Sequence, residues 1–228
     1  MSAHDPQSPR PQAILWDFDG TLVDTEPVWM EAEKSTITSY GKTWTREQSI
    51  EWVGAATEAA TKYFASYIDI EGVDWRHLSS EIERQVAEHN RTRPIPFLPG
   101  AKEILGECAD AGVPIALVTM SPPLVVASIL DRMPGVFATV VNGADVEQGK
   151  PHPEPYLRAA SALGVDPAQC LAFEDSNFGA QSANAAGAVV VAVPSFKAIG
   201  PAPRRVIIES LAGLTLADAF DLYSGALA

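Results

Sequence analysis

A-I-L-W-D-F-D-G-T-L-V-D-T-E, residues 13–26, is the stretch that decides the fold of this chain. Its first four residues are apolar, which is typical of a short buried strand. Asp17 and Asp19 follow at once, and Gly20 then lets the chain leave the strand in a conformation that other residues avoid. Carboxylates two residues apart on an extended chain point to the same side, and such a pair needs a cation or a shared proton. The pattern indicates a site for a hard cation such as Mg²⁺, or else a strand end whose acids face water.

The composition is that of an ordinary globular protein. The chain has 228 residues, 46% of them hydrophobic and 20% charged, which suffices for one medium-sized domain with a small insert. Its formal net charge of −13 argues against nucleic acid and against an anionic membrane surface as partners. No apolar run is long enough to span a bilayer. Cys108 and Cys170 lie in apolar patterns, which favours buried free thiols over a disulfide.

The beginning of the chain differs from the rest. Residues 1–12 are polar and rich in proline, without the hydrophobic region of a signal peptide. We therefore expect a disordered tail over these residues and a cytoplasmic protein.

Between residues 25 and 94 the strand patterns disappear and helical patterns follow one another. Thr45 with Gln48 three residues later forms the pattern of a capping box at the start of one helix. The expected helices cover residues 26–40, 45–54, 57–68 and 75–90. The sequence thus predicts an all-helical cap over 25–94, inserted into a core domain made of 13–24 and 95–228. Two crossings, near 22–25 and 93–99, would let the cap hinge over the first motif.

From residue 100 onward helices and strands alternate. The expected strands cover 113–119, 137–141, 170–173, 188–193 and 206–208, and the expected helices 101–111, 122–132, 154–163, 177–186 and 214–222. Repeated strand–helix units with near-continuous apolar strands predict an α/β fold. Its core is a Rossmann-like parallel sheet with helices on both faces. In such sheets the ligand site lies at the carboxyl ends of the strands.

Reactive side chains follow those strand ends. They are Asp17, Asp19, Thr119, Met120, Ser121, Lys150, Glu174 and Asp175. Taken alone, Thr119 could cap a strand end, Lys150 could be a solvated loop lysine, and the acid pair could sit at a helix N-terminus. Together they supply a nucleophile, a proton carrier, a phosphate clamp and metal ligands. A magnesium-dependent phosphoryl-transfer site needs this set.

The string D-F-D-G-T-L-V-D-T-E resembles the first motif of the haloacid dehalogenase-like hydrolase superfamily. More narrowly, the chain is similar to the helical-cap branch that holds phosphoglycolate phosphatase and β-phosphoglucomutase. The later strings G-K-P-H-P-E-P-Y, from residue 149, and F-E-D-S-N-F-G, from residue 173, are similar to the third and fourth motifs. The resemblance covers nearly the whole chain from residue 13.

The resemblance implies a role for each motif residue. It makes Asp17 the nucleophile that forms an aspartyl-phosphate and Asp19 the general acid and base. Thr119 would hydrogen-bond the phosphoryl group, with Met120 and Ser121 beside it at the substrate, and Lys150 would neutralise nucleophile and phosphate. The implied Mg²⁺ ligands are Asp17, Asp19, Asp175 and, less firmly, Glu174.

Departures from the family pattern narrow the function. The mutase branch has a histidine where this chain has Trp29, and an arginine in a cap loop that reads Gly54-Ala55-Ala56-Thr57 here. Both absences argue against a mutase, which must hold a bisphosphate at both ends. True haloacid dehalogenases lack the second aspartate, so Asp19 argues against that chemistry. Met120 replaces an asparagine that phosphatases of the family often carry.

The sequence therefore predicts a Mg²⁺-dependent phosphatase for small phosphomonoesters, such as a sugar phosphate or a phosphoglycolate-like ester. The alternatives are a sugar-phosphate mutase and a non-catalytic binding protein on the same fold. Candidate substrate contacts from the cap are Trp29, Thr57, Lys62 and Arg91. A monomer would suffice, because the cap is supplied in the same chain.

Overall fold

A parallel sheet forms the centre of the computed structural model, which describes residues 9–228. In the described part the strand order is β3-β2-β1-β4-β5-β6, and all neighbouring strands run parallel. The strands are β1 (Ala13–Trp16), β2 (Ile115–Val118), β3 (Thr139–Val141), β4 (Cys170–Glu174), β5 (Val189–Ala192) and β6 (Arg205–Ile207). Strand β1 lies between β2 and β4, where the order of the strands reverses. A ligand site is expected at the carboxyl end of this switch point.

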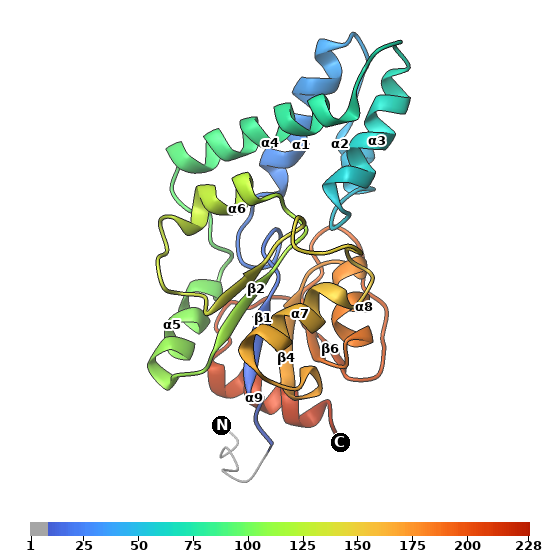
Figure 1. Ribbon diagram of the computed structural model, residues 1–228. Coiled ribbons are helices and arrows are strands. Elements are labelled where there is room, and N and C mark those ends of the chain that lie inside the picture. Colours follow the sequence, from blue (N-terminus) through green and yellow to red (C-terminus); the bar gives the residue numbers. More distant parts are fainter. Residues whose placement is uncertain (1–8) are drawn as a thin grey trace.

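Helices cover the sheet and build the cap above it (Figure 1). The cap helices are α1 (Glu26–Ser39), α2 (Arg46–Ile50), α3 (Thr57–Ile68) and α4 (Trp75–Thr92). The core helices are α5 (Ala101–Ala111), α6 (Pro123–Leu130), α7 (Glu154–Leu163), the 3₁₀ helix η1 (Pro167–Gln169), α8 (Asn177–Ala185) and α9 (Leu216–Gly225). In the described residues, no helix combines the length and the apolar character needed to cross a membrane.

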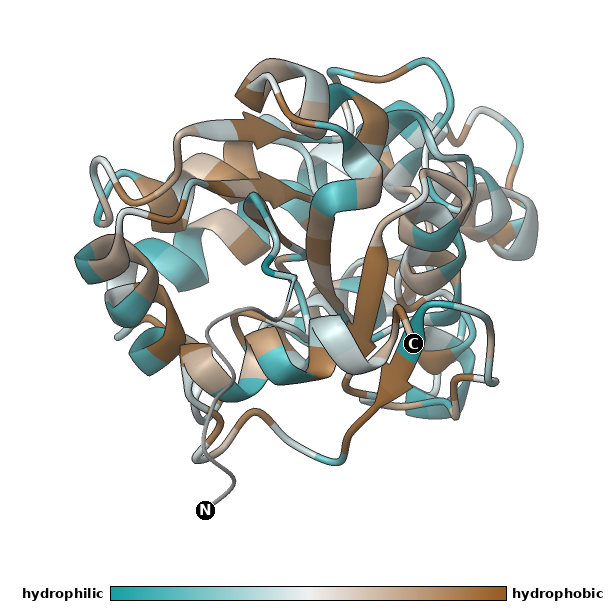
Figure 2. Cartoon of the chain, turned by 90° about the horizontal axis from the view of Figure 1, so that it is seen from below, coloured by the Kyte–Doolittle hydropathy of each residue, from teal (hydrophilic) through white to brown (hydrophobic). Residues whose placement is uncertain are grey.

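The two faces of the sheet carry separate apolar clusters because successive strand residues point to opposite faces. On one face Ile14 and Trp16 pack in a cluster with residues of α5 and α9. On the other face Ala13 and Leu15 pack in a cluster with residues of α7 and α8. Figure 2 shows mostly hydrophobic strands, whereas the surrounding helices carry both hydrophobic and hydrophilic residues. Since both faces are covered, polar chemistry is confined to the ends of the strands.

The cap has an apolar cluster of its own. Ile37 of α1, Phe64 of α3 and Leu78 of α4 belong to it, and Val125 of α6 joins them from the core. The ring centroid of Trp44 lies 5.0 Å from that of Phe64. This cluster stabilises the cap separately from the sheet, and Val125 ties it to the core helix below.

Two crossings join the cap to the core, and they are hydrogen-bonded to each other. Val23 forms an isolated antiparallel bridge with Phe97. The backbone N–H of Asp24 donates to the carbonyl of Pro96 at 2.8 Å. The two connections therefore lie side by side directly after the motif that carries Asp17.

The cap also contacts the core on both of its flanks. Arg132, just after α6, donates to the carbonyl of Asn90 in α4 at 3.0 Å. Lys197 of the core forms an ion pair with Glu51 of the cap at 2.8 Å. The cap therefore lies over the carboxyl ends of the strands, where cap and core residues line the same pocket.

The α/β fold, the parallel sheet and the all-helical cap are as the sequence predicts. The capping box is also confirmed, because Thr45 Oγ1 accepts from the N–H of Gln48 at 3.3 Å and Gln48 Oε1 accepts from the N–H of Thr45 at 2.9 Å. Strand β2 begins at Ile115, not at 113, since Pro114 has no N–H for the ladder. Helix α2 ends at Ile50, earlier than expected, and the chain then turns towards the site.

The expected tail is only partly within the described residues. Residues 1–8 of the predicted 1–12 segment lie outside them. The backbone N–H of Gln12 donates to the carbonyl of Gln169 at 2.7 Å, just before β1 begins. The two buried cysteines, Cys108 and Cys170, are free thiols, as predicted.

Gly100 provides a test of the packing beneath the cap. It has a φ of +88°, and a Cβ atom there would collide with the backbone carbonyl of Leu211. We expect Gly100→Ala to lower the free energy of unfolding by about 3 kcal/mol, since it combines a strained φ with a backbone clash. Gly106→Ala is the matched control within α5, because a Cβ at this position has no atom within 4 Å. It should raise the free energy of unfolding by about 1 kcal/mol or less. Urea unfolding of both variants checks this, and equal midpoints would contradict it.

Candidate active site

The end of β1 places Asp17 against Lys150. Lys150 Nζ donates to Asp17 Oδ1 and to Glu174 Oε1, each at 2.6 Å, and to the carbonyl of Val118 at 3.0 Å. Thr21 Oγ1 donates to the other oxygen of Asp17 at 2.8 Å. Burial alone would lower the pKa of Lys150, but the carboxylates of Asp17 and Glu174 outweigh it and hold this pKa above its usual range. The lysine is therefore a fixed positive charge beside Asp17.

Three buried carboxyl groups crowd this end of the sheet. Ligand atoms of Asp17, Glu174 and Asp175 all lie within 4.8 Å of one another. Burial, with added repulsion from Asp17 and Glu174, raises the pKa of Asp175 well above its usual value. Gly20 is required beside them, because it has a φ of +82° and a Cβ there would collide with the Asp175 carboxylate. One lysine cannot balance three carboxylates, so the cluster has the charge and the oxygen donors that suit a divalent cation.

The carboxylates differ in how far they are already satisfied. Glu174 Oε1 accepts from Lys150 and from the hydroxyl of Tyr156, the latter at 2.6 Å, and Oε2 accepts from the N–H of Asp175 at 3.2 Å. Asp175 Oδ2 accepts from Ser195 Oγ at 2.6 Å, and among the described residues no hydrogen bond to its Oδ1 is present. Asp175 is thus better placed to hold a metal than Glu174.

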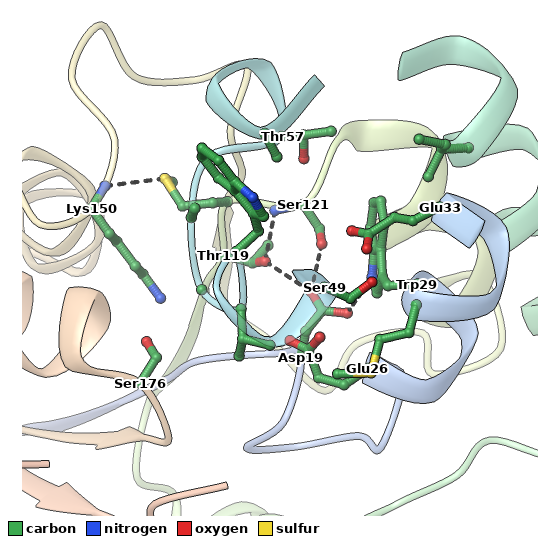
Figure 3. Close-up of a pocket in the computed structure, with 18 of the residues that line it drawn as sticks. Asp19, Glu26, Trp29, Glu33, Ser49, Thr57, Thr119, Ser121, Lys150 and Ser176 are labelled. Carbon is green, nitrogen blue, oxygen red and sulfur yellow. Dashed lines mark hydrogen bonds between the residues drawn. The ribbon is translucent and has the colours of Figure 1, made fainter. Parts of the chain in front are cut away.

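Asp19 is held by donors from both the core and the cap. Ser121 Oγ donates to Asp19 Oδ2 at 2.5 Å, and Thr119 Oγ1 donates to the same oxygen at 3.4 Å. The indole N–H of Trp29 donates to Asp19 Oδ1 at 3.2 Å, and the hydroxyl of Thr25 donates to it as well. Burial raises the pKa of Asp19, and the hydrogen bonds from Ser121 and Thr25 offset part of that rise. Figure 3 shows Asp19 between Trp29 and the Thr119–Ser121 turn.

The turn after β2 forms one side of the site. Thr119 Oγ1 accepts from the N–H of Ser121 at 2.9 Å, which fixes the turn. Met120 Sδ accepts from the N–H of Lys150 at 3.2 Å, so this side chain connects the turn to the loop that carries the lysine. The turn therefore positions hydroxyl groups and the lysine around the same space.

One pocket brings most of the predicted residues together. Those that line it are Asp17, Asp19, Trp29, Thr57, Thr119, Met120, Ser121, Lys150 and Asp175. Glu174 is fully buried behind Lys150 and does not line it. Lys62 and Arg91 do not line it either, contrary to expectation. Lys62 lies on the outer face of α3, where it pairs with Glu58 at 2.5 Å, and Arg91 is exposed near the end of α4.

The pocket lining also includes residues that the sequence did not single out. Among them, Glu26 and Glu33 of α1 and Ser49 of α2 contribute polar side chains from the cap. Glu26 is buried, and this burial raises its pKa well above the usual value. Glu33 could have been found, because it occupies the apolar-stripe position between Met30 and Ile37.

The comparisons with known proteins agree with this geometry. A family model for haloacid dehalogenase-like hydrolases matches residues 14–193. Hexitol phosphatase B of Escherichia coli K12 is 30% identical over 92% of this chain and 96% of its own length. The bifunctional riboflavin kinase/FMN phosphatase of Arabidopsis thaliana is 33% identical over 80% of this chain, which spans about half (48%) of that longer relative.

Solved structures show the same fold. CbbY of Rhodobacter sphaeroides, in complex with xylulose-1,5-bisphosphate, superposes with a TM-score of 0.82 at 25% identity, over 92% of this chain and 99% of its own. A β-phosphoglucomutase of Clostridium difficile gives a TM-score of 0.83 at 18% identity, over 95% and 99% of the two chains. The chain belongs to the haloacid dehalogenase-like hydrolase family. It is a phosphomonoester hydrolase of the helical-cap branch.

Glu33 gives a pH-dependent stability that can be measured. Burial raises its pKa to about 7, so the folded protein keeps this proton where the unfolded chain releases it near pH 4.5. Ionisation of Glu33 therefore lowers the free energy of unfolding as the pH rises from about 4.5 to 7. Above pH 7 the loss reaches about 3 kcal/mol. We expect Glu33→Gln to raise the melting temperature at pH 8 and to raise it less at pH 5.5. Glu31→Gln, at an exposed position of the same helix, is the control and should show no such difference.

Proposed function

We propose that this protein is a Mg²⁺-dependent phosphatase that hydrolyses small phosphomonoesters through an aspartyl-phosphate on Asp17. The observation that carries the proposal is the contact of Lys150 Nζ with Asp17 Oδ1 at 2.6 Å, with Asp19 two residues further on. A lysine in this position orients the carboxylate and places positive charge beside the site of attack. Relatives named as phosphatases support the same reaction class.

The proposed reaction has two steps. Asp17 attacks phosphorus, and a carboxylate–phosphorus bond forms as the ester bond to the leaving oxygen breaks. Asp19 gives its proton to that oxygen, so the alcohol leaves neutral. Asp19 then takes a proton from water, which attacks the phosphorus and releases phosphate and free Asp17. The donors on Asp19 from Ser121 and Trp29 keep it oriented for both proton transfers.

Mg²⁺ fits the acidic cluster, and we propose Asp17 and Asp175 as side-chain ligands, with Asp19 contributing from the first motif and Glu174 a weaker candidate. When bound, the ion supplies positive charge that offsets the carboxylates and the phosphoryl group. Ser195 and Lys150 orient the side chains of Asp175 and Asp17 for this purpose.

The pocket favours a phosphatase over a mutase. Trp29 stands at the position of the mutase histidine, and its N–H is already donated to Asp19. The cap loop at Gly54 has no arginine, and a Cβ at this glycine would lie 2.7 Å from Ser176 Oγ, so the loop sits directly on the core. We further propose that the protein acts as a monomer in the cytoplasm. The cap in the same chain and the free thiols of Cys108 and Cys170 support this proposal.

Replacement of the nucleophile tests the reaction class. We expect Asp17→Asn to reduce phosphate release from p-nitrophenyl phosphate by about 1,000-fold or more, because the amide cannot form the acyl-phosphate. Asp24→Asn, at an exposed position seven residues later, is the matched control and should keep near-normal rates. Retention of most turnover in Asp17→Asn would exclude Asp17 as the nucleophile.

Removal of metal tests the cofactor. Dialysis against a chelator should abolish phosphate release, and added Mg²⁺ should restore it, since the acidic cluster otherwise repels the phosphoryl group. The midpoint of thermal unfolding should also rise on adding Mg²⁺, because a ligand of the folded state stabilises it. Full activity in the chelated protein would argue against a metal requirement.

A further inference from the structure

The pocket continues from the acidic centre into the cap. Its cap wall, formed by the cap residues that line it, includes Glu26, Glu33, Ser49, Thr57, Phe64 and Ile82. The pocket holds about 720 Å³ of space not filled by protein atoms, and this figure includes the part open to solvent. A substrate whose phosphoryl group reaches Asp17 must direct the rest of its body towards this wall.

Glu33 is the unusual member of the wall. It is buried (8% exposed), and its Oε2 has no hydrogen-bond partner among the described residues, although Ser49 and Trp44 lie close enough to the carboxyl group to offset part of the rise in its pKa. Phe64 and Ile82 line the same pocket, so an apolar residue would suit this position better. A buried carboxyl oxygen without a donor costs stability, and a donor on a bound ligand would satisfy it. Figure 3 shows the Glu33 carboxyl group pointing from α1 into the pocket.

The charge of the wall restricts the ligand further. Among described residues that line the pocket, Lys150 is the only lysine or arginine, and it already bridges Asp17 and Glu174. The cap wall contributes the acids Glu26 and Glu33 and no basic side chain. A substrate with a carboxylate or a second phosphate at its far end would lose its hydration there with no basic side chain to compensate the loss.

We propose that Glu33 determines substrate specificity by accepting a hydrogen bond from a substrate hydroxyl group, and that the substrate is the monophosphate ester of a neutral sugar or polyol. The inference rests on the proposed phosphatase function and narrows its substrate class. The hydroxyl group of Thr57 in the same wall can bond another hydroxyl of such a chain, and Phe64 can pack against its carbon atoms.

Equilibrium binding tests the proposal without turnover. In an Asp17→Asn background with Mg²⁺, calorimetric titration would compare glucitol 6-phosphate, phosphoglycolate, fructose 1,6-bisphosphate and phosphoethanolamine. We expect glucitol 6-phosphate to bind at least about tenfold more tightly than the two esters with anionic tails. Adding Glu33→Leu, which removes the acceptor and fits an apolar wall, should weaken glucitol 6-phosphate binding by about tenfold or more.

Two variants complete the design. At pH 8, above the Glu33 pKa of about 7, Glu33→Gln keeps an acceptor oxygen but loses the charge, so it should narrow the preference for glucitol 6-phosphate over the anionic esters at least about threefold. Glu31→Leu, exposed on the same helix, should leave all dissociation constants unchanged. Should Glu33→Leu prove poorly folded by circular dichroism, the Glu33→Gln comparison decides.

Three results would overturn the proposal. In the first, glucitol 6-phosphate binds equally well with and without the Glu33→Leu substitution. In the second, phosphoglycolate or fructose 1,6-bisphosphate binds most tightly of the four esters. In the third, phosphoethanolamine binds most tightly, which would indicate an ammonium ligand. Phosphate release from the same esters by the unmodified enzyme is measured in parallel. If no ester is hydrolysed, the phosphatase proposal fails, whereas the binding contrasts still decide the role of Glu33.

Discussion

The buried ammonium group of Lys150 is the interaction on which the site depends. It binds Asp17 and Glu174 at 2.6 Å each, in a region that these carboxylates share with Asp175. Removing one partner from such a buried network leaves an uncompensated charge, which costs far more than a surface ion pair. The same contact that stabilises the folded site also holds the side chain of Asp17 in place. Stability and proposed reactivity therefore rest on one contact between loops 133 residues apart.

The parallel sheet makes that contact possible. All the strand ends open on one edge, and the helices on both faces leave polar groups nowhere else to gather. The cap then closes the edge from above. It is tied to the core by the paired crossings at Val23 and Phe97, and it rests on the flanks through Arg132 and Lys197. Its inner wall adds acids and apolar groups to a site that the core alone would leave open.

Glu33 and Glu26 show how the cap departs from simple helix rules. Both lie on α1, and both are buried where an amphipathic helix would place apolar residues. Burial raises the pKa of each, so the fold gives up stability at these positions. Losses of this kind are expected at functional sites. The cap therefore contributes acidic side chains to the pocket, whereas the core contributes the basic side chain of Lys150.

The sequence by itself determined the fold class, the helical insert and the residues at the strand ends. The apolar runs of β1, β2 and β4 predict buried strands, and the motif residues lie next to these runs in the chain. Only the tertiary structure decided which cap residues enter the pocket. Helix α3 presents several faces, and its packing places Thr57 in the pocket while turning Lys62 outward. That choice depends on how helices pack across long separations in the chain, which local patterns do not encode.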